Sequence, residues 1–96
     1  LNNANLQKAT LMRSYLSETE MINADLTDAY LDQATLLKTN LTNANLNLVS
    51  LQYANIQNWI IKGVRCKKVW INGGWINYKH DIDFEKSFTF IENTIK

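Results

Sequence analysis

The sequence is poor in the residues that metal sites, disulfides and phosphate loops depend on. Its 96 residues include one histidine, His80, and one cysteine, Cys66. A single cysteine excludes an internal disulfide, and a single histidine excludes a histidine-based metal cluster. There are no prolines, and the three glycines form no glycine-rich phosphate loop, because only Gly73 and Gly74 are adjacent. No catalytic residue, metal or cofactor is therefore predicted, and the chain is expected to be non-enzymatic.

The chain also lacks an excess of charge of either sign and a long hydrophobic run. Its formal net charge is +1 at pH 7, and no apolar run approaches the roughly 18 residues that a membrane-spanning helix needs. The composition therefore predicts neither a membrane protein nor a strongly electrostatic nucleic-acid binder. No signal peptide is visible, which favours the cytoplasm. The absence of an initial methionine suggests a trimmed N-terminus or a piece of a longer protein.

What the sequence has instead is a five-residue period. A column of mainly large apolar residues, the centre column, recurs at every fifth position: Leu1, Leu6, Leu11, Leu16, Met21, Leu26, Leu31, Leu36, Leu41, Leu46, Leu51, Ile56, Ile61, Cys66, Ile71 and Ile76. Two residues before each centre stands a column of mostly small residues, the small column: Ala4, Ala9, Ser14, Thr19, Ala24, Ala29, Ala34, Thr39, Ala44, Val49, Ala54, Trp59, Val64, Val69 and Gly74.

A period of five fits neither a straight helix nor a flat strand. In an α-helix a step of five residues rotates the side chain by about 140°, and on a flat strand an odd step moves it to the opposite face. Both columns stay inside only if the chain turns a corner once per repeat, so that four corners close a square coil of twenty residues. Thr19 and Thr39, the two threonines of the small column, are twenty residues apart. Residues 1–78 are then expected to form about four coils, roughly 19 Å long at about 4.8 Å per coil.

Within this coil the Asn or Asp that often stands between the two columns has an expected role. It should adopt the dihedral angles of the corner and hydrogen-bond its own backbone. The outward residues Gln7, Thr27 and Asn47 are expected to tolerate replacement by Ala, unlike the inward Leu26 and Leu46.

The repeat resembles the pentapeptide-repeat family. Its motif A-(N/D)-L-x-x stands here as Ala4-Asn5-Leu6, Ala24-Asp25-Leu26 and Ala44-Asn45-Leu46, with an isoleucine variant at residues 54–56 and looser copies to about Tyr78. The resemblance implies an all-β fold, a right-handed quadrilateral β-helix, and the Leu-centred style is most similar to cyanobacterial members. It implies little about function, since most such proteins have no assigned activity.

Two functional alternatives follow from the resemblance. Some pentapeptide-repeat proteins mimic DNA and protect topoisomerases, which implies a strongly acidic rod. Residues 1–78 contain seven basic and five acidic residues, a net charge of +2, which argues against this role. The favoured interpretation is a structural or protein-interaction solenoid of unspecified role. An accessory C-terminal repeat domain of a larger regulatory protein is the other alternative.

The repeats become irregular after Asn58, where aromatic and basic residues gather. Residues 59–78 hold four basic residues and no acidic one. One interpretation is a degenerate final coil, because terminal repeats are often atypical. The other is a partner surface, made of Arg65, Lys67, Lys68, Trp70 and Trp75. Such a surface favours a protein partner, because even the four basic residues of this region make a small patch for nucleic acid.

Residues 79–96 leave the five-residue period and are predicted to cap the solenoid, as a short helix. Their apolar residues Phe84, Phe88, Ile91 and Ile95 have helical spacing, although a strand through residues 88–91 is the rival interpretation. This stripe is expected to cover the open end of the coils, with Phe84 or Phe88 against Trp59 or Ile76. A homodimer through the same end is an alternative.

Three smaller features complete the expectations. Cys66 lies in the centre column and should be a buried, unreactive thiol. Asp25, Asp28 and Asp32 are expected on a solvated face. Asn72 and Gly73 are expected to form a turn.

Overall fold

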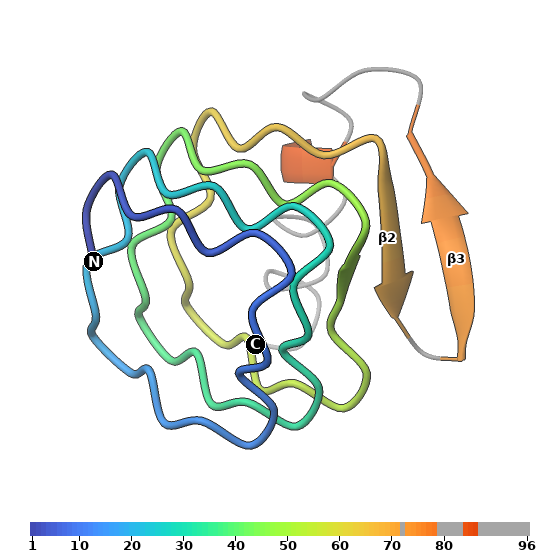
Figure 1. Cartoon of the computed structure of the whole chain (residues 1–96), viewed down its shortest axis with the longest axis horizontal. Helices are drawn as coiled ribbons and strands as arrows, with labels where there is room; N and C mark the ends of the chain where they lie inside the picture. Colours follow the sequence, from blue (N-terminus) through green and yellow to red (C-terminus); the bar gives the residue numbers. More distant parts are fainter. Residues whose placement is uncertain (72, 79–83, 87–96) are drawn as a thin grey trace.

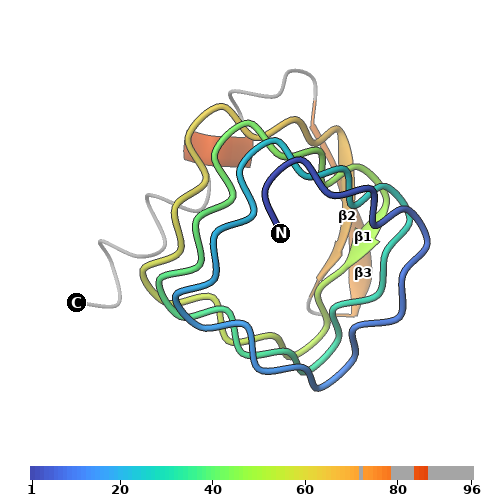
Figure 2. The ribbon, with the colours of Figure 1, turned by 60° about the vertical axis from the view of Figure 1, so that its left-hand side comes forward.

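The chain winds into stacked four-sided coils, which Figures 1 and 2 show from two directions. The computed structural model describes residues 1–71, 73–78 and 84–86. The isolated β-bridges, from Asn5–Asp25 to Asn45–Arg65, each join residues twenty positions apart in parallel. These bridges confirm the twenty-residue coil. The described residues form three complete coils and the start of a fourth.

Backbone hydrogen bonds hold each coil to the next in a pattern that recurs on the sides of the stack. The Leu6 N–H donates to the carbonyl of Asp25 at 2.8 Å, and the Asp25 N–H donates to the carbonyl of Ala4 at 3.0 Å. Each coil therefore satisfies the polar backbone groups of its neighbour, as paired strands do.

A β-turn forms each corner. The Ala4 N–H donates to the carbonyl of Leu1 at 3.1 Å, and the residue before Ala4, Asn3, has a φ of 63°. Positive φ recurs at every fifth residue from Asn3 to Asn58, and then at Gly63. One positive φ in the second central position is the signature of a type II turn.

The expected role of Asn and Asp at the corner is wrong in one respect and confirmed in the other. The residue with positive φ lies two positions after the centre residue. Lys8, Arg13 and Tyr53 occupy such positions, because hydrogen bonds between the coils stabilise the turn. The Asn or Asp before the centre instead accepts a backbone hydrogen bond from two residues on. Asp25 Oδ1 accepts the Thr27 N–H at 3.1 Å, and Asn45 Oδ1 accepts the Asn47 N–H at 2.9 Å.

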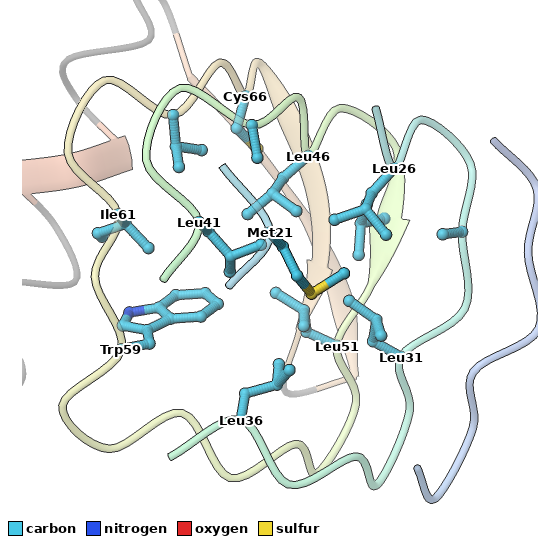
Figure 3. Packing of buried hydrophobic residues seen from close by; sticks show 14 of the residues in the cluster. Met21, Leu26, Leu31, Leu36, Leu41, Leu46, Leu51, Trp59, Ile61 and Cys66 are labelled. Carbon is cyan, nitrogen blue, oxygen red and sulfur yellow. The ribbon is translucent and has the colours of Figure 1, made fainter. Parts of the chain in front are cut away.

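The two columns point inward and fill the coils, as predicted from the period. In the second and third coils the centre residues from Met21 to Leu51 are at most 1% exposed. Figure 3 shows these side chains converging on the interior. Leu6, Leu11 and Leu16 of the first coil are only partly buried, because they are packed against a coil on one side.

The regular coil gives way to a small sheet after Cys66. The sheet contains β1 (Val49–Ser50), β2 (Lys68–Ile71) and β3 (Gly74–Asn77). Strand β2 pairs in parallel with β1 at the twenty-residue register, with Val49 opposite Val69. Lys68 has no positive φ, so the corner expected at residues 67–68 is straightened into β2.

The predicted turn is confirmed at Gly73, where the chain reverses, and Asn72 lies outside the described residues. Strand β3 pairs antiparallel with β2, with Trp70 opposite Trp75, and Gly73 has a φ of 83°. Residues 74–77 are therefore the outer strand of a hairpin rather than a further side of the coil. The prediction that Ile76 continues the inward centre column is wrong, because Ile76 is 40% exposed.

The tail is described over one helical turn, residues 84–86. Phe88, Ile91 and Ile95 lie outside the described residues, as does most of the predicted cap. The choice between a helix and a strand over residues 88–91 therefore stays a prediction.

One outward residue has a structural role that the period alone does not reveal. Asn47 Oδ1 accepts the N–H groups of Lys67, at 3.3 Å, and Lys68, at 3.1 Å. It thereby holds the segment in which the regular corner is lost. Asn47 should not be as replaceable as Gln7 and Thr27.

We expect Leu46→Ala to lower the free energy of unfolding by about 2–5 kcal/mol, because it leaves a cavity inside the coils. Asn47→Ala should cost about 1 kcal/mol by removing the acceptor of two backbone N–H groups. Thr27→Ala should cost less than either change, because its side chain hydrogen-bonds only within its own repeat. Urea unfolding followed by circular dichroism measures all three. Equal losses at positions 27, 46 and 47 would contradict the inward and outward assignment.

Asp25 should make the fold sensitive to acid. Hydrogen bonds from the Thr27 side chain and backbone hold the pKa of its carboxyl below the ordinary value, and Gln7 and Arg65 act in the same direction against partial burial. Because the folded pKa is lowered, the stabilisation is present above the unfolded pKa and is lost as pH falls through the folded pKa. Asp25→Asn should therefore reduce the loss of stability between about pH 5 and about pH 3.

The control for this measurement is Asp28→Asn. No described residue donates a hydrogen bond to the Asp28 side chain. Asn is compatible with position 25, because Asn5 and Asn45 occupy the paired positions in the neighbouring coils. Urea unfolding at about pH 5 and about pH 3 should show a reduced loss of stability in acid for Asp25→Asn but not for Asp28→Asn. An unchanged pH dependence would show that Asp25 does not contribute.

Candidate functional site

One side of the stack carries a groove lined by aromatic residues. Its floor follows an outward column in which Thr10, Tyr30, Ser50 and Trp70 are stacked by parallel pairing twenty residues apart. The groove has a volume of about 600 Å³. It is lined by Lys8, Asp28, Tyr30, Leu48, Ser50, Trp70 and Trp75.

The repeat and the hairpin together place the groove residues. Lys8, Asp28 and Leu48 occupy corner positions with positive φ, so they form a ridge along one coil edge. Tyr30, Ser50 and Trp70 lie two residues further along each coil. Trp75 comes from β3, beyond the last coil strand. The groove therefore runs across three coils and the hairpin.

Three aromatic side chains give the groove its apolar surface. The rings of Trp70 and Trp75 meet edge to face, with centroids 5.3 Å apart and an interplanar angle of 74°. The Lys68 Nζ lies 5.1 Å from the centroid of the Trp75 ring, a cation–π contact worth about 0.5–1 kcal/mol at an exposed site. Tyr30 is 51% exposed and Trp75 44% exposed, so both offer aromatic surface to a partner.

The groove floor is held by polar contacts between the coils. The Ser50 hydroxyl donates to Asp32 Oδ1, which also accepts the Gln52 N–H at 3.0 Å. These contacts fix the strand that separates Tyr30 from Trp70. Asp25, Asp28 and Asp32 are all partly exposed, as expected of a solvated face; Asp28 lines the groove, whereas Asp32 bonds to the next coil.

The structure divides the predicted partner surface between two sides. Trp70 and Trp75 line the aromatic groove, and Lys68 stacks on Trp75. Arg65 and Lys67 instead line a second hollow of about 270 Å³, together with Asn45, Asn47 and Cys66. Sequence reasoning missed Lys8, Asp28, Tyr30, Leu48 and Ser50. The twenty-residue register was the signal, because it places positions 30, 50 and 70 in one outward column.

Aromatic residues gather against the last complete coil. Phe84 is fully buried, and its ring centroid lies 6.0 Å from that of Trp59 and 5.5 Å from that of Tyr78. Trp59 follows Thr19 and Thr39 in the small column and is 4% exposed. The carboxylate of Glu85 accepts the Gly63 N–H at 3.4 Å. The tail and the last complete coil are therefore in direct contact.

A family model for pentapeptide repeats matches residues 1–33 and 24–58, which together make up more than half of the chain. The chain belongs to the pentapeptide-repeat family. The predicted resemblance is confirmed, and membership gives the coils the family's fold, a right-handed β-helix. No curated protein matches the chain.

One solved structure of the family is similar to this pentapeptide-repeat chain. It is the crystal structure of a pentapeptide repeat protein (Rfr23) from the cyanobacterium Cyanothece 51142, with 33% sequence identity and a TM-score of 0.47. The similarity covers 69% of this chain and 53% of the other. The chain thus spans about half the length of that protein.

The groove extends beyond the matched repeats. Tyr30 and Ser50 belong to the pentapeptide repeats, whereas Trp70 and Trp75 lie after residue 58, where the family match ends. Residues outside the family match therefore complete a surface that the repeats begin.

The position of Cys66 and two absences among the described residues complete the description of this pentapeptide-repeat chain. Cys66 is 1% exposed, which confirms the predicted inward position of its thiol. Among the residues that the structure describes, no group of three or more His, Cys, Asp or Glu side chains could hold a metal ion. No helix found there is long and apolar enough to cross a membrane.

Proposed function

We propose that this pentapeptide-repeat chain is a non-enzymatic binding module that holds a protein partner in its aromatic groove. The observation that carries the proposal is the set of three aromatic side chains, Tyr30, Trp70 and Trp75, along one groove. Tyr and Trp are enriched at protein interfaces and dominate the binding energy where they are buried by a partner.

The rigidity of the coils supports the proposal. Each wall of the groove is tied to the next coil by backbone hydrogen bonds, and Trp70 is held in β2 between β1 and β3. A surface that is ordered before binding loses little conformational entropy when the partner arrives.

The charges around the groove favour a protein over a nucleic acid. Its rim carries both Lys8 and Asp28, and Lys68 is engaged with the Trp75 ring. Nucleic-acid sites gather basic residues along the path of the phosphates. A mixed rim is typical of a polypeptide-binding surface.

Site-specific photo-crosslinking tests the proposed function. We expect a photoreactive phenylalanine derivative at position 30 to form an adduct with one defined protein from the source organism. The matched control is position 53, where Tyr53 is 76% exposed and does not line the groove. Trp75→Ala should reduce the position-30 adduct at least tenfold, corresponding to about 1.4 kcal/mol of binding free energy. Equal labelling from positions 30 and 53 would argue against the groove.

The second part of the proposal is that residues 79–96 cap the C-terminal end of the solenoid. Its support is Phe84, which is buried against Trp59 and Tyr78. Covering the end of the coils keeps the interior away from water and removes an open edge.

Phe84→Ala should lower the free energy of unfolding by about 3–5 kcal/mol, as removal of a buried Phe side chain does. Lys86→Ala is the control, because Lys86 is exposed on the same helical turn. Thermal unfolding of both variants, with light scattering to detect self-association, measures the effect. If Phe84→Ala unfolds like Lys86→Ala, the tail is not a cap.

A further inference from the structure

Strand β3 has one paired edge and one edge without a partner among the described residues. Gly74–Asn77 pair with β2 along one side, and no described residue pairs with the other side. Figure 1 shows β3 as the outermost strand, with β2 between it and the coils. Trp75 and Ile76 are 44% and 40% exposed, on opposite faces of this strand.

The hydrogen-bond alternation identifies the backbone groups on the outer edge. The Tyr78 N–H donates to the carbonyl of Lys67 at 2.6 Å. In an antiparallel pair, hydrogen-bonded and non-hydrogen-bonded positions alternate. Val69 and Ile76 therefore form a hydrogen-bonded pair, whereas Trp70 and Trp75 do not. The backbone N–H and C=O groups of Trp75 and Asn77 point away from β2.

The outer edge also lacks the features that prevent strands from associating. Natural edge strands are protected by charged residues, proline or a bulge. Strand β3 reads Gly-Trp-Ile-Asn, with no charged residue and no proline, and its pairing with β2 is continuous over four residues. Two such edges can approach without charge repulsion between them.

We propose that β3 pairs antiparallel with β3 of a second copy, about a two-fold axis between the two Ile76 residues. The outward-pointing backbone N–H and C=O groups determine the register. The groups of Trp75 in one copy hydrogen-bond with those of Asn77 in the second copy. Each of these two pairs exchanges both backbone hydrogen bonds, and Ile76 lies opposite its own counterpart. That central pair is non-hydrogen-bonded, so its Cα atoms lie about 4.5 Å apart.

A second copy is the occupant that the edge chemistry fits best. When β3 pairs with β3 of a second copy, each outward N–H lies opposite an outward C=O. The two exposed Ile76 side chains also bury each other on one face of the sheet. A two-fold interface is closed, so it stops at a dimer. The sheet becomes continuous across both copies, with the two aromatic grooves on its other face. The pairing does not depend on what the groove binds.

Backbone-specific variants of the full chain provide the first test. Asn77→Pro removes an outward N–H without removing a bond to β2, because Asn77 and Lys68 are a non-hydrogen-bonded pair. Asn77→Ala changes the side chain and keeps the N–H. Sedimentation velocity should show the 11.1 kDa chain and Asn77→Ala reaching twice that mass as concentration rises, with Asn77→Pro remaining monomeric. Circular dichroism should show that all three are folded. A monomeric parent chain, or a dimer unaffected by Asn77→Pro, overturns the proposal.

Disulfide trapping tests the register. With Cys66→Ser as background, Ile76→Cys should form a covalent dimer on oxidation, because the two cysteines are opposite each other. Trp75→Cys is the control, since its counterpart is displaced by two residues, roughly 7 Å along the strand. Efficient trapping of Ile76→Cys alone supports the proposal. Equal trapping of both variants, or trapping of Trp75→Cys alone, excludes this register.

Discussion

Backbone hydrogen bonding between successive coils is the interaction on which the rest of this structure depends. Each coil donates to and accepts from the coil twenty residues away, as between Leu6, Asp25 and Ala4. The pairing compels one residue per repeat to adopt positive φ, even where that residue is Lys, Arg or Tyr. Steric cost at those corners is offset because the next coil satisfies the polar groups around them. The inward columns then fill a narrow interior and exclude water from it. Contacts within a single repeat would not enclose this interior.

The loss of one corner shapes the aromatic surface of this chain. At residues 67–68 the backbone runs straight into β2, held by the side chain of Asn47 in the coil before it. The chain then reverses, and β3 runs back along β2. Trp75 thereby meets Trp70 on the outer face of the sheet, and Trp70 continues the column that contains Tyr30. A repeat scaffold supplies the rigid floor, and a short irregular segment supplies most of the aromatic surface.

The same hairpin links the two proposals. Its outer face contributes Trp75 to the groove, and its outer edge presents the backbone of Trp75 and Asn77. Pairing through the edge would leave the grooves open, because the aromatic rings and the backbone groups lie in perpendicular directions. Two grooves on one continuous sheet would bind a repetitive or dimeric partner more tightly than either groove alone.

The twenty-residue coil and the inward columns were predictable from the sequence alone, because a five-residue period leaves only one way to bury Leu26, Leu46 and Ala44 together. The buried thiol of Cys66 followed from the same spacing, and the turn at Gly73 followed from the Asn-Gly dipeptide. The groove was only half predictable. Trp70 and Trp75 stood out as aromatic residues near basic ones, but Tyr30 and Asp28 join them through stacking, which composition does not reveal.

Tertiary structure decided the points at which the pattern stops. Ile76 continues the five-residue spacing but is exposed, because antiparallel pairing with β2 competes with a further corner and wins. Asn47 looks like any outward residue of the repeat, yet its amide accepts backbone groups from the next coil. Local sequence determines which residues favour the interior of a coil. Whether another coil forms there depends on hydrogen bonds between segments about twenty residues apart, and these exist only after folding.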